Sequence, residues 1–304
     1  MRGFSSHWLS LREPYDTQAR NQSVFNSVVS SYRYRSSPIR IIDLGCGSGA
    51  ALRALAPHFS VEQRWRLFDN DRHLLACASR MSFAGVHIEP IPLDLNRELE
   101  IALERPVNLV TCFALLDLVS ENWLERFASI VVMRGLPVYA ALTYDGRITA
   151  SPADTFDQMI VQAINDHQRK DKGFGLALGS TSAAWALRRF EALGYSVVHG
   201  TSDWMLTPND GDIQMELLSG WALAAGQIGL APDKVANWLD RRRELIAANQ
   251  SRVRVGHTDF WAYQTSSSMR MAVAFPSTYP DPAAKRVHAH PGRTPPVVAE
   301  RHAA

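Results

Sequence analysis

The chain has 304 residues, of which 46% are hydrophobic and 20% charged, and its formal net charge is +2. This composition is typical of a globular protein with a sizeable core, and no long basic run favours a nucleic-acid partner. The three cysteines, Cys46, Cys77 and Cys112, form no CxxC pair, so the sequence predicts neither a metal site nor a disulfide framework. Sparse cysteine usage is typical of a reducing compartment, and we therefore expect a cytoplasmic protein.

The sequence also predicts no targeting segment and no membrane contact. Residues 1–16 contain no uninterrupted apolar stretch, so we expect no signal peptide. The most apolar region, 128–144, is interrupted by Arg134, Gly135 and Pro137, which makes it unsuitable for crossing a membrane. We expect this region to form a buried strand instead.

The first half of the chain alternates between strand-like and helical patterns. Residues 1–35 are expected to form one or two helices, with a helix beginning after Pro14. The expected strands are 39–45, 64–69, 86–95, 107–117 and 136–146, and the helices between them are 51–59, 72–80 and 121–132. This alternation predicts a parallel sheet with helices on both faces and a ligand at the carboxyl ends of the strands.

The pattern changes after Gly146. A helix is expected to begin at Ser151 and Pro152, and a glycine-rich loop follows it. Further helices are expected at 182–195, 211–226 and 233–249, and strands at 195–206 and 251–264. Residues 266–304 hold six of the 16 prolines and show no clear periodicity, so we expect a disordered tail.

The segment IRIIDLGCGSGA, residues 39–50, predicts a strand that runs into a glycine turn and then a helix. Such a turn lets the backbone approach a nucleotide-like ligand closely. Gly45, Gly47 and Ala50 match the dinucleotide fingerprint GxGxxG/A, so the turn alone leaves the ligand open. The acidic residue Asp69, at the end of the second strand, would suit either ligand because it can accept bonds from ribose hydroxyls.

Three details favour a ligand with an ammonium group. Asp43 lies two residues before the first glycine, where a buried carboxylate would repel a pyrophosphate and attract a cation. A third glycine, Gly49, completes the pattern DxGxGxG. Asp94 ends the third strand, where it can accept a bond from an adenine amino group, with Leu95 against the ring. Ammonium, ribose diol and adenine are the polar groups of S-adenosylmethionine.

With these residues the sequence resembles the class I S-adenosylmethionine-dependent methyltransferases. The resemblance covers about residues 39–120, in the segments IIDLGCGSG, LFDND, PLDL and NLVTCFALLDLV. It implies a three-layer α/β sandwich with a mostly parallel seven-stranded sheet, an antiparallel last strand and helical insertions. It further implies that S-adenosylmethionine is the cofactor.

The resemblance also implies cofactor-binding residues. The turn residues would approach the methionine end of the cofactor. The residues at the ends of the second and third strands would bind its ribose and its adenine, and those at the end of the fourth strand would line the floor of the cofactor site. The implied cofactor-binding set is Asp43, Gly45, Cys46, Gly47, Gly49, Asp69, Asn70, Asp94, Leu95 and Phe113, with Ala114 as an alternative to Phe113. Simpler roles stay open: Asp43 as a turn cap, Asp69 as a helix N-cap and Asp94 as a turn residue.

The implied domain organisation has three parts. Residues 1–35 would cover the active site, 36–265 would form the methyltransferase domain, and 266–304 would be the tail. Helical insertions are expected at about 151–172 and 211–249, and the second insertion departs from the minimal family pattern.

The methyl acceptor is less constrained than the donor. The segment after the fourth strand reads CFALLDL and lacks the Asn/Asp-Pro-Pro-aromatic motif of many amino-methylating enzymes. A small-molecule acceptor is therefore expected, methylated at oxygen, and the basic cluster at 167–172 favours an anionic one.

Candidate acceptor-site residues come from five segments, and each also has a purely structural alternative. The expected catalytic residues are Asp117, Tyr144 and His167. The expected substrate-binding residues are Trp8, Arg12, Tyr15, Arg169 and Lys172, with Asp145, Arg147, Asp203 and Trp204 as further candidates.

Three other functions stay open at this point. An NAD-dependent oxidoreductase is opposed by Asp43 and by the absence of a Tyr-x-x-x-Lys pair at the expected place. A non-catalytic methyltransferase-fold module is opposed by the intact acidic and glycine residues of the turn. An RNA- or protein-modifying methyltransferase would need an exposed basic groove.

Overall fold

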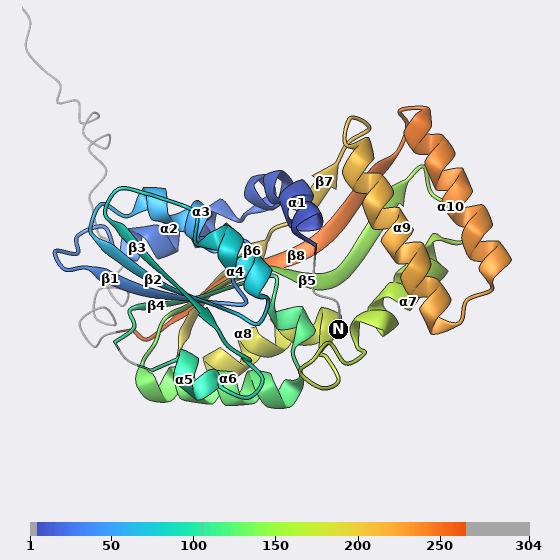
Figure 1. The fold of residues 1–304 in the computed structure, drawn as a ribbon. Helices are drawn as coiled ribbons and strands as arrows, with labels where there is room; N and C mark the ends of the chain where they lie inside the picture. Colours follow the sequence, from blue (N-terminus) through green and yellow to red (C-terminus); the bar gives the residue numbers. More distant parts are fainter. Residues whose placement is uncertain (1–4, 105, 266–304) are drawn as a thin grey trace, which may run out of the picture. The chain divides into compact units, whose positions relative to one another are not determined.

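The computed structural model describes residues 5–104 and 106–265. Its strands form one sheet in the order β3-β2-β1-β4-β5-β8-β6, and the short strand β7 pairs with β8 (Figure 1). The pairs among β1 to β5 are parallel, and β8 is antiparallel to its neighbours. The strands are β1 (Ile39–Leu44), β2 (Gln63–Asp69), β3 (Val86–Pro92), β4 (Leu109–Phe113), β5 (Val138–Ser151), β6 (Ser196–Thr201), β7 (Trp204–Leu206) and β8 (Arg252–Tyr263). The predicted mostly parallel sheet with an antiparallel last strand is confirmed.

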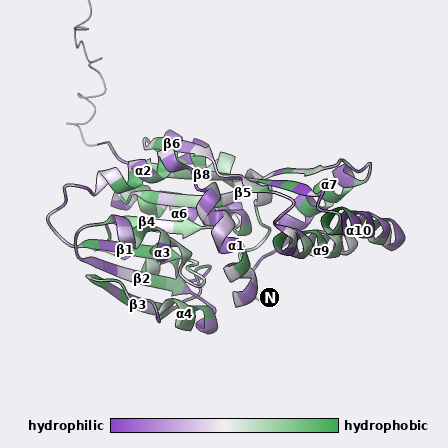
Figure 2. Cartoon of the chain, turned by 90° about the horizontal axis from the view of Figure 1, so that it is seen from above, coloured by the Kyte–Doolittle hydropathy of each residue, from purple (hydrophilic) through white to green (hydrophobic). Residues whose placement is uncertain are grey.

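Helices cover both faces of the sheet (Figure 1). On one face lie α1 (Ser6–Ala19), α2 (Gln22–Ser31), α3 (Ala50–Leu55) and α4 (Arg72–Ala78). On the other lie α5 (Leu99–Ala102), α6 (Glu121–Arg134) and α8 (Ser182–Ala192). Each face has its own core, one around Leu52 and Trp65 and the other around Trp123 and Phe127. In Figure 2 the hydrophobic colour is concentrated on the central strands between these layers.

Strand β1 is buried because four of its six residues are apolar and helices cover both faces of the sheet. All but one of the residues in β1 are buried, as a parallel strand covered on both faces requires. The helix that follows β4 has clear end signals: the Ser120 side chain accepts a bond from the Trp123 amide, and Gly135 ends α6 in a left-handed conformation. These local signals fix where strand and helix alternate, and so place the loops at the carboxyl edge of the sheet.

Strands β5 and β8 extend beyond the rest of the sheet and carry a second helical layer (Figure 1). This layer consists of α7 (Asp157–Gln168), α9 (Gly211–Ile228) and α10 (Pro232–Ala247), and has its own core around Trp238. Helices α9 and α10 lie between β7 and β8 in the chain, within the second expected insertion. Among the described residues, no helix combines the length and the apolar character needed to cross a bilayer.

Several expected boundaries are wrong. Helix α1 begins at Ser6, before Pro14, because the Ser5 hydroxyl caps it by accepting a bond from the Trp8 amide, 3.1 Å away. The region 128–144 forms the end of α6 and the start of β5, because Gly135 separates them. The tail expected at 266–304 lies outside the described residues, and the domain boundaries stay a prediction.

The fifth strand is longer than the sequence predicts. We expected β5 to end at Gly146 and a helix to begin at Ser151, but β5 continues to Ser151 and α7 begins at Asp157. The strand passes two irregularities in its pairing with β8, between Ala140 and Thr143 and between Tyr144 and Ile148. The glycine therefore belongs to a bulge, a feature that local sequence does not distinguish from a turn.

Candidate active site

The glycine turn lies where β1 ends and α3 begins. Gly45, Gly47 and Gly49 have φ values of +66°, +52° and +90°, a region that only glycine adopts readily. At Gly49 a Cβ atom would also lie 2.2 Å from the Met81 Cε atom. The turn thus needs glycine for its backbone shape, whereas the flexible end of Met81 could move aside for a side chain.

Asp69 connects this turn to the end of β2. Its Oδ2 atom accepts a hydrogen bond from the Gly47 amide at 2.8 Å, and its Oδ1 atom accepts one from the Asp71 amide at 2.9 Å. The N-cap of α4 is Asp71, so the alternative reading of Asp69 as that cap is wrong. Each carboxylate oxygen has a second lone pair, which remains available for a ligand hydroxyl. Neighbouring Asn70 is exposed.

Asp43 is a buried carboxylate at the end of β1. Its Oδ1 atom accepts a hydrogen bond from the Thr111 hydroxyl at 2.8 Å. Burial raises the pKa of Asp43 to about 7, against the lowering effect of the Thr111 bond. Among residues 5–104 and 106–265, no basic side chain forms an ion pair with it. A cationic group of a ligand would therefore stabilise the ionised form.

Cys46 and the residues after β3 pack into the protein. The Cys46 side chain is buried, and burial raises the pKa of its thiol. Asp94 Oδ1 accepts a bond from the Asn96 amide at 2.9 Å, which is the geometry of a turn residue. Leu95 is buried in the core, and its carbonyl accepts a bond from Trp123 Nε1 at 2.8 Å. The adenine roles of Asp94 and Leu95 stay a prediction.

Phe113, the last residue of β4, lies beside an arginine that the sequence did not single out. The Arg20 guanidinium carbon is 5.4 Å from the centre of the Phe113 ring and 5.8 Å from that of Phe25. Arg20 is only 7% exposed, and its Nε atom has no hydrogen-bond partner. It lines a pocket between α1, α2 and α3, together with Glu13, Asp16, Thr17, Ala50 and Arg53 among others.

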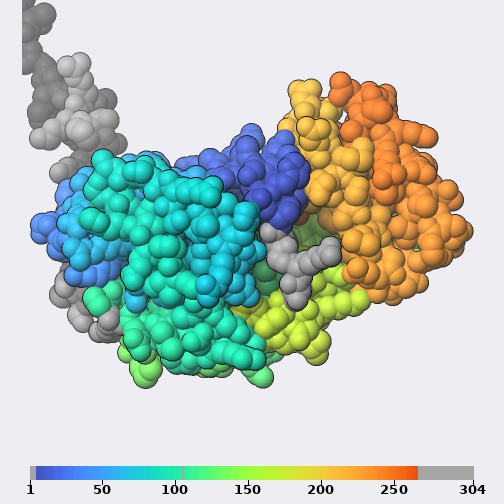
Figure 3. All heavy atoms as spheres, viewed as in Figure 1, coloured from blue at the N-terminus to red at the C-terminus, as the bar shows by residue number. Residues whose placement is uncertain are grey.

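Helix α1 covers the glycine turn. The Leu9 side chain lies 3.4 Å from the place where a Cβ of Gly47 would be. Arg53 of α3 donates to the Ser48 carbonyl at 2.6 Å and to Glu13 of α1 at 2.7 Å. Figure 3 shows α1, in dark blue, between the surface of β2 and α4 and the helices α9 and α10.

The three candidates on α1 face the second helical layer. Trp8 packs edge-on against Trp204, with ring centres 6.2 Å apart. Arg12 pairs with Asp16 at 2.9 Å and lies over the Trp204 ring at 5.0 Å. Tyr15 donates to Asp210 at 3.0 Å, and burial together with that carboxylate raises the pKa of Tyr15.

Asp117 is buried after β4, in the short 3-10 helix η2 (Leu116–Leu118). Its Oδ1 atom has no hydrogen-bond partner. Burial raises the pKa of Asp117 to about 6, while Arg12 and Lys172 act in the opposite direction. The cap of α6 is Ser120, so the alternative of Asp117 as a helix cap is wrong.

The other catalytic candidates already have partners. The Tyr144 hydroxyl donates to Asn165 Oδ1 at 2.9 Å, and burial raises the pKa of Tyr144. His167 Nε2 lies 2.7 Å from Gln227 Oε1, and Lys172 Nζ lies 3.4 Å from His167 Nδ1. The structure therefore brings His167 and Lys172 together.

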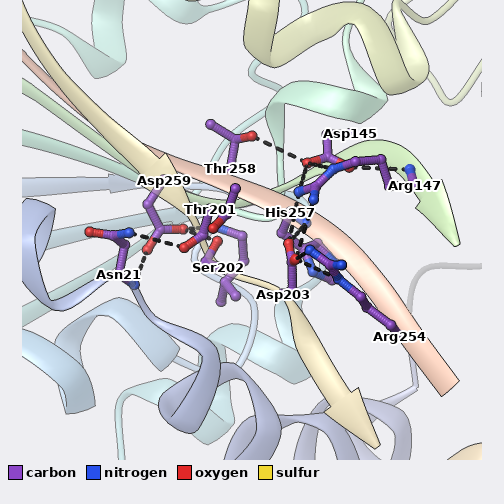
Figure 4. Close-up of polar contacts among 11 residues, drawn as sticks. Asn21, Asp145, Arg147, Thr201, Ser202, Asp203, Arg254, His257, Thr258 and Asp259 are labelled. Carbon is purple, nitrogen blue, oxygen red and sulfur yellow. Dashed lines mark hydrogen bonds and ion pairs between the residues drawn. The ribbon is translucent and has the colours of Figure 1, made fainter. Parts of the chain in front are cut away.

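Arg169 is exposed beside Gly179, apart from the His167 and Lys172 contact. The candidates near the end of β5 form an ion-pair network (Figure 4). Arg147 pairs with Asp203 at 2.8 Å and also with Asp145, and Arg254 pairs with Asp203. Both carboxylates are thus neutralised, and the network links β5 to β8 and to the loop before β7.

Comparison with known proteins adds only distant similarities. No protein-family model and no curated protein sequence matches the chain. A cyclopropane synthase from Mycobacterium tuberculosis has a TM-score of 0.43 and 9% identity, over 86% of this chain and 100% of the other.

Two further solved structures are similar at the same level. A SAM-dependent methyltransferase from Thiobacillus denitrificans, in complex with S-adenosylhomocysteine, has a TM-score of 0.42 and 15% identity over 86% and 100% of the two chains. A phosphoethanolamine N-methyltransferase from Haemonchus contortus has a TM-score of 0.41 and 14% identity over 81% and 53%. The function of this chain is therefore inferred from its own residues.

Proposed function

We propose that the protein is an S-adenosylmethionine-dependent methyltransferase that methylates a small molecule at oxygen. The observation that carries this proposal is the arrangement at the carboxyl edge of the sheet. There a glycine turn lies between a buried carboxylate without a cation, Asp43, and a second carboxylate, Asp69, that is bonded to the turn itself. A ligand that carries both an ammonium group and a ribose diol would pair with both carboxylates, the ammonium group with Asp43 and the diol with Asp69.

The buried guanidinium of Arg20, whose Nε atom has no hydrogen-bond partner, is a third group that fits this cofactor. A buried cation is costly unless an anion neutralises it, and the methionine carboxylate of S-adenosylmethionine is such an anion. Arg20 lies against Phe113 and lines the pocket that also includes Ala50, next to the glycine turn. We assign Asp43 to the ammonium group, Asp69 to the ribose, Arg20 to the carboxylate, and Asp94 with Leu95 to the adenine.

When bound, the cofactor supplies an electrophilic methyl group on a sulfonium. The protein then has to align the acceptor with that methyl group and exclude water. Phe113 and Ala114 would form the floor of the cofactor site. Helix α1 covers the turn through Leu9, and its Glu13 pairs with Arg53 of α3.

The residues that would surround the methyl acceptor lie at the same edge of the sheet. We place the acceptor next to Asp117, between α1 and the segment of Lys172. Tyr144 and His167 shape this region through their bonds to Asn165 and Gln227. The preference for oxygen is supported by the absence of the Pro-Pro motif after β4. A cytoplasmic location is part of this proposal.

Calorimetric titration of the purified protein with S-adenosylmethionine, S-adenosylhomocysteine and NAD tests the cofactor assignment. We expect micromolar binding of the two adenosyl ligands and no binding of NAD. Binding of NAD alone would favour an oxidoreductase. Absence of all binding would favour a module that acts through a protein partner.

A further inference from the structure

One face of helix α1 is bonded to β7 and to the start of α9. The buried Asp16 carboxylate accepts a hydrogen bond from Trp204 Nε1 at 3.0 Å, and it also pairs with Arg12, which lies over the Trp204 ring. Tyr15 donates to Asp210, at the N-cap position of α9, across 3.0 Å. Hydrogen bonds whose partners are buried are costly to break, because the separated groups lose their partners. These contacts therefore join α1 to β7 and α9.

The adjoining face of α1 is attached to the glycine turn by fewer and more exposed contacts. Leu9 lies 3.4 Å from the position that a Cβ of Gly47 would occupy, and Glu13 pairs with Arg53 of α3 at 2.7 Å. The side chains of Arg53 and Glu13 are 31% and 29% exposed, and ion pairs open to water contribute little stability. A pocket of about 340 Å³ lies between α1, α2 and α3. The contact of α1 with the turn is thus the easier one to open.

The elements that hold α1 are joined to the sheet through an irregular part of the β5–β8 ribbon. Strand β7 pairs with residues 253–255 of β8, which lie beyond the irregularity between Tyr144 and Ile148 of β5. Helices α9 and α10 follow β7 and lie at the far end of this ribbon (Figure 1). A bulge bends a strand locally. The ribbon therefore offers a place at which β7, α9 and α10 can shift together relative to the turn.

We propose that α1, β7, α9 and α10 form one lid over the glycine turn, and that the Glu13–Arg53 ion pair keeps this lid closed. The proposal rests on the proposed function, because the ligand that the lid admits is S-adenosylmethionine or its product. Opening breaks the ion pair and moves Leu9 away from Gly47. The bonds from α1 to Trp204 and Asp210 stay intact, so the inserted helices control how fast the cofactor exchanges.

A different motion, in which α1 opens alone, would have another signature. Helix α1 would then have to break its bonds to Trp204 and Asp210 as well as the Glu13–Arg53 ion pair. Loss of the Tyr15 hydroxyl would make that motion easier and would speed exchange. In the common lid the same bond is not broken on opening, so its loss should leave exchange unchanged. The two motions are therefore distinguishable by one hydroxyl group.

The test measures the association and release rates of radiolabelled S-adenosylhomocysteine on the full chain. Glu13→Gln removes the charge of the closing ion pair, which is present with and without ligand. We expect both rate constants to rise by a similar factor, about two- to fivefold, with the Kd within about twofold of wild type.

Two further variants complete this experiment. Tyr15→Phe removes the bond to Asp210 and should change neither rate by more than about 1.5-fold, because that bond lies within the lid. Glu125→Gln is the matched control: it removes a similarly exposed ion pair, between Glu125 of α6 and Arg189 of α8, away from the lid. Its rates should equal those of wild type.

Each outcome supports or overturns the proposal. Unchanged rates in Glu13→Gln would overturn the closing role of the ion pair, and so would faster release with unchanged association, since Glu13 would then stabilise only the bound state. Faster exchange in Tyr15→Phe would overturn the common lid and show that α1 opens alone. A wild type that does not bind S-adenosylhomocysteine would remove the proposed function itself, and with it the ligand of the lid.

Discussion

The main-chain amide of Gly47 donates a hydrogen bond to Oδ2 of Asp69 across 2.8 Å, so that the turn after β1 and the end of β2 form one unit. The substitution Asp69→Ala removes this bond together with the assigned ribose acceptor. We expect cofactor binding to weaken by roughly 1–3 kcal/mol, measured by calorimetry with S-adenosylhomocysteine.

The matched control for that substitution is Asp71→Ala. Asp71 caps α4 through the His73 and Leu74 amides and has no assigned contact with the cofactor. Its loss should cost about 1 kcal/mol of folding stability and leave the affinity unchanged. Equal affinities of wild type and Asp69→Ala would mean that Asp69 only holds the turn.

Asp43→Asn should stabilise the cofactor-free protein at high pH. The pKa of Asp43 is raised to about 7 in the folded state, above its value in the unfolded chain. Its contribution to stability is therefore fully present below the unfolded pKa and is lost as pH rises through about 7. At about pH 8 the neutral amide should raise the free energy of unfolding by on the order of 2–4 kcal/mol, with a smaller gain at about pH 5.

Urea denaturation at both pH values measures the stability effect of Asp43→Asn. The same variant should bind S-adenosylmethionine more weakly, because the amide carries no charge for the ammonium group. In wild type the affinity should rise as pH increases through about 7, with proton release that depends on the buffer in calorimetry. A variant that is less stable at high pH would contradict the assignment of Asp43 as an unpaired buried carboxylate.

Arg20→Gln should weaken binding of S-adenosylhomocysteine by about 1.5–3 kcal/mol, because a charge-assisted bond to the carboxylate is lost. Methylthioadenosine lacks the amino-acid part of the cofactor and is the control ligand. Its affinity should be the same for wild type and variant. A similar loss for both ligands would show that Arg20 supports the fold of the pocket instead of binding the carboxylate.

Asp259→Ala should strongly destabilise the protein. This buried carboxylate accepts bonds from the Leu142 amide at 2.7 Å, from the Asn21 amide at 2.9 Å and from the Ser202 hydroxyl (Figure 4). We expect a loss of about 2–5 kcal/mol in urea denaturation, because three donors, in two buried bonds and one part-buried bond, lose their acceptor. Asp240→Ala, at an exposed position of α10, should change stability by less than about 0.5 kcal/mol.

The sequence was sufficient to predict the order of strands and helices and the place of the glycine turn. Mostly apolar runs such as β1 and glycines with positive φ are local signals, and the alternation of strands and helices follows from them. The boundaries of β5 could not be predicted, because its extension depends on pairing with β8 more than 100 residues later. The sequence around Gly146 is compatible with both a turn and a bulge.

The site was only partly predictable for the same reason. Asp43 and Asp69 lie within a motif, whereas Arg20 follows a helix with no flanking signal. What distinguishes Arg20 is its burial with an Nε atom that has no hydrogen-bond partner, which depends on contacts between segments far apart in the sequence.

The position of β8 between β5 and β6 has a consequence for biosynthesis. Strands β1 to β5 emerge from the ribosome in order and can pair as they appear, but β5 keeps one edge unpaired until Arg252–Tyr263 has been translated. That edge includes the apolar run Val138–Leu142 and is open to pairing with other chains during about a hundred residues of synthesis. A stop codon or ribosome pause before β8 therefore yields an aggregation-prone intermediate, and chaperone demand should be greatest in that interval.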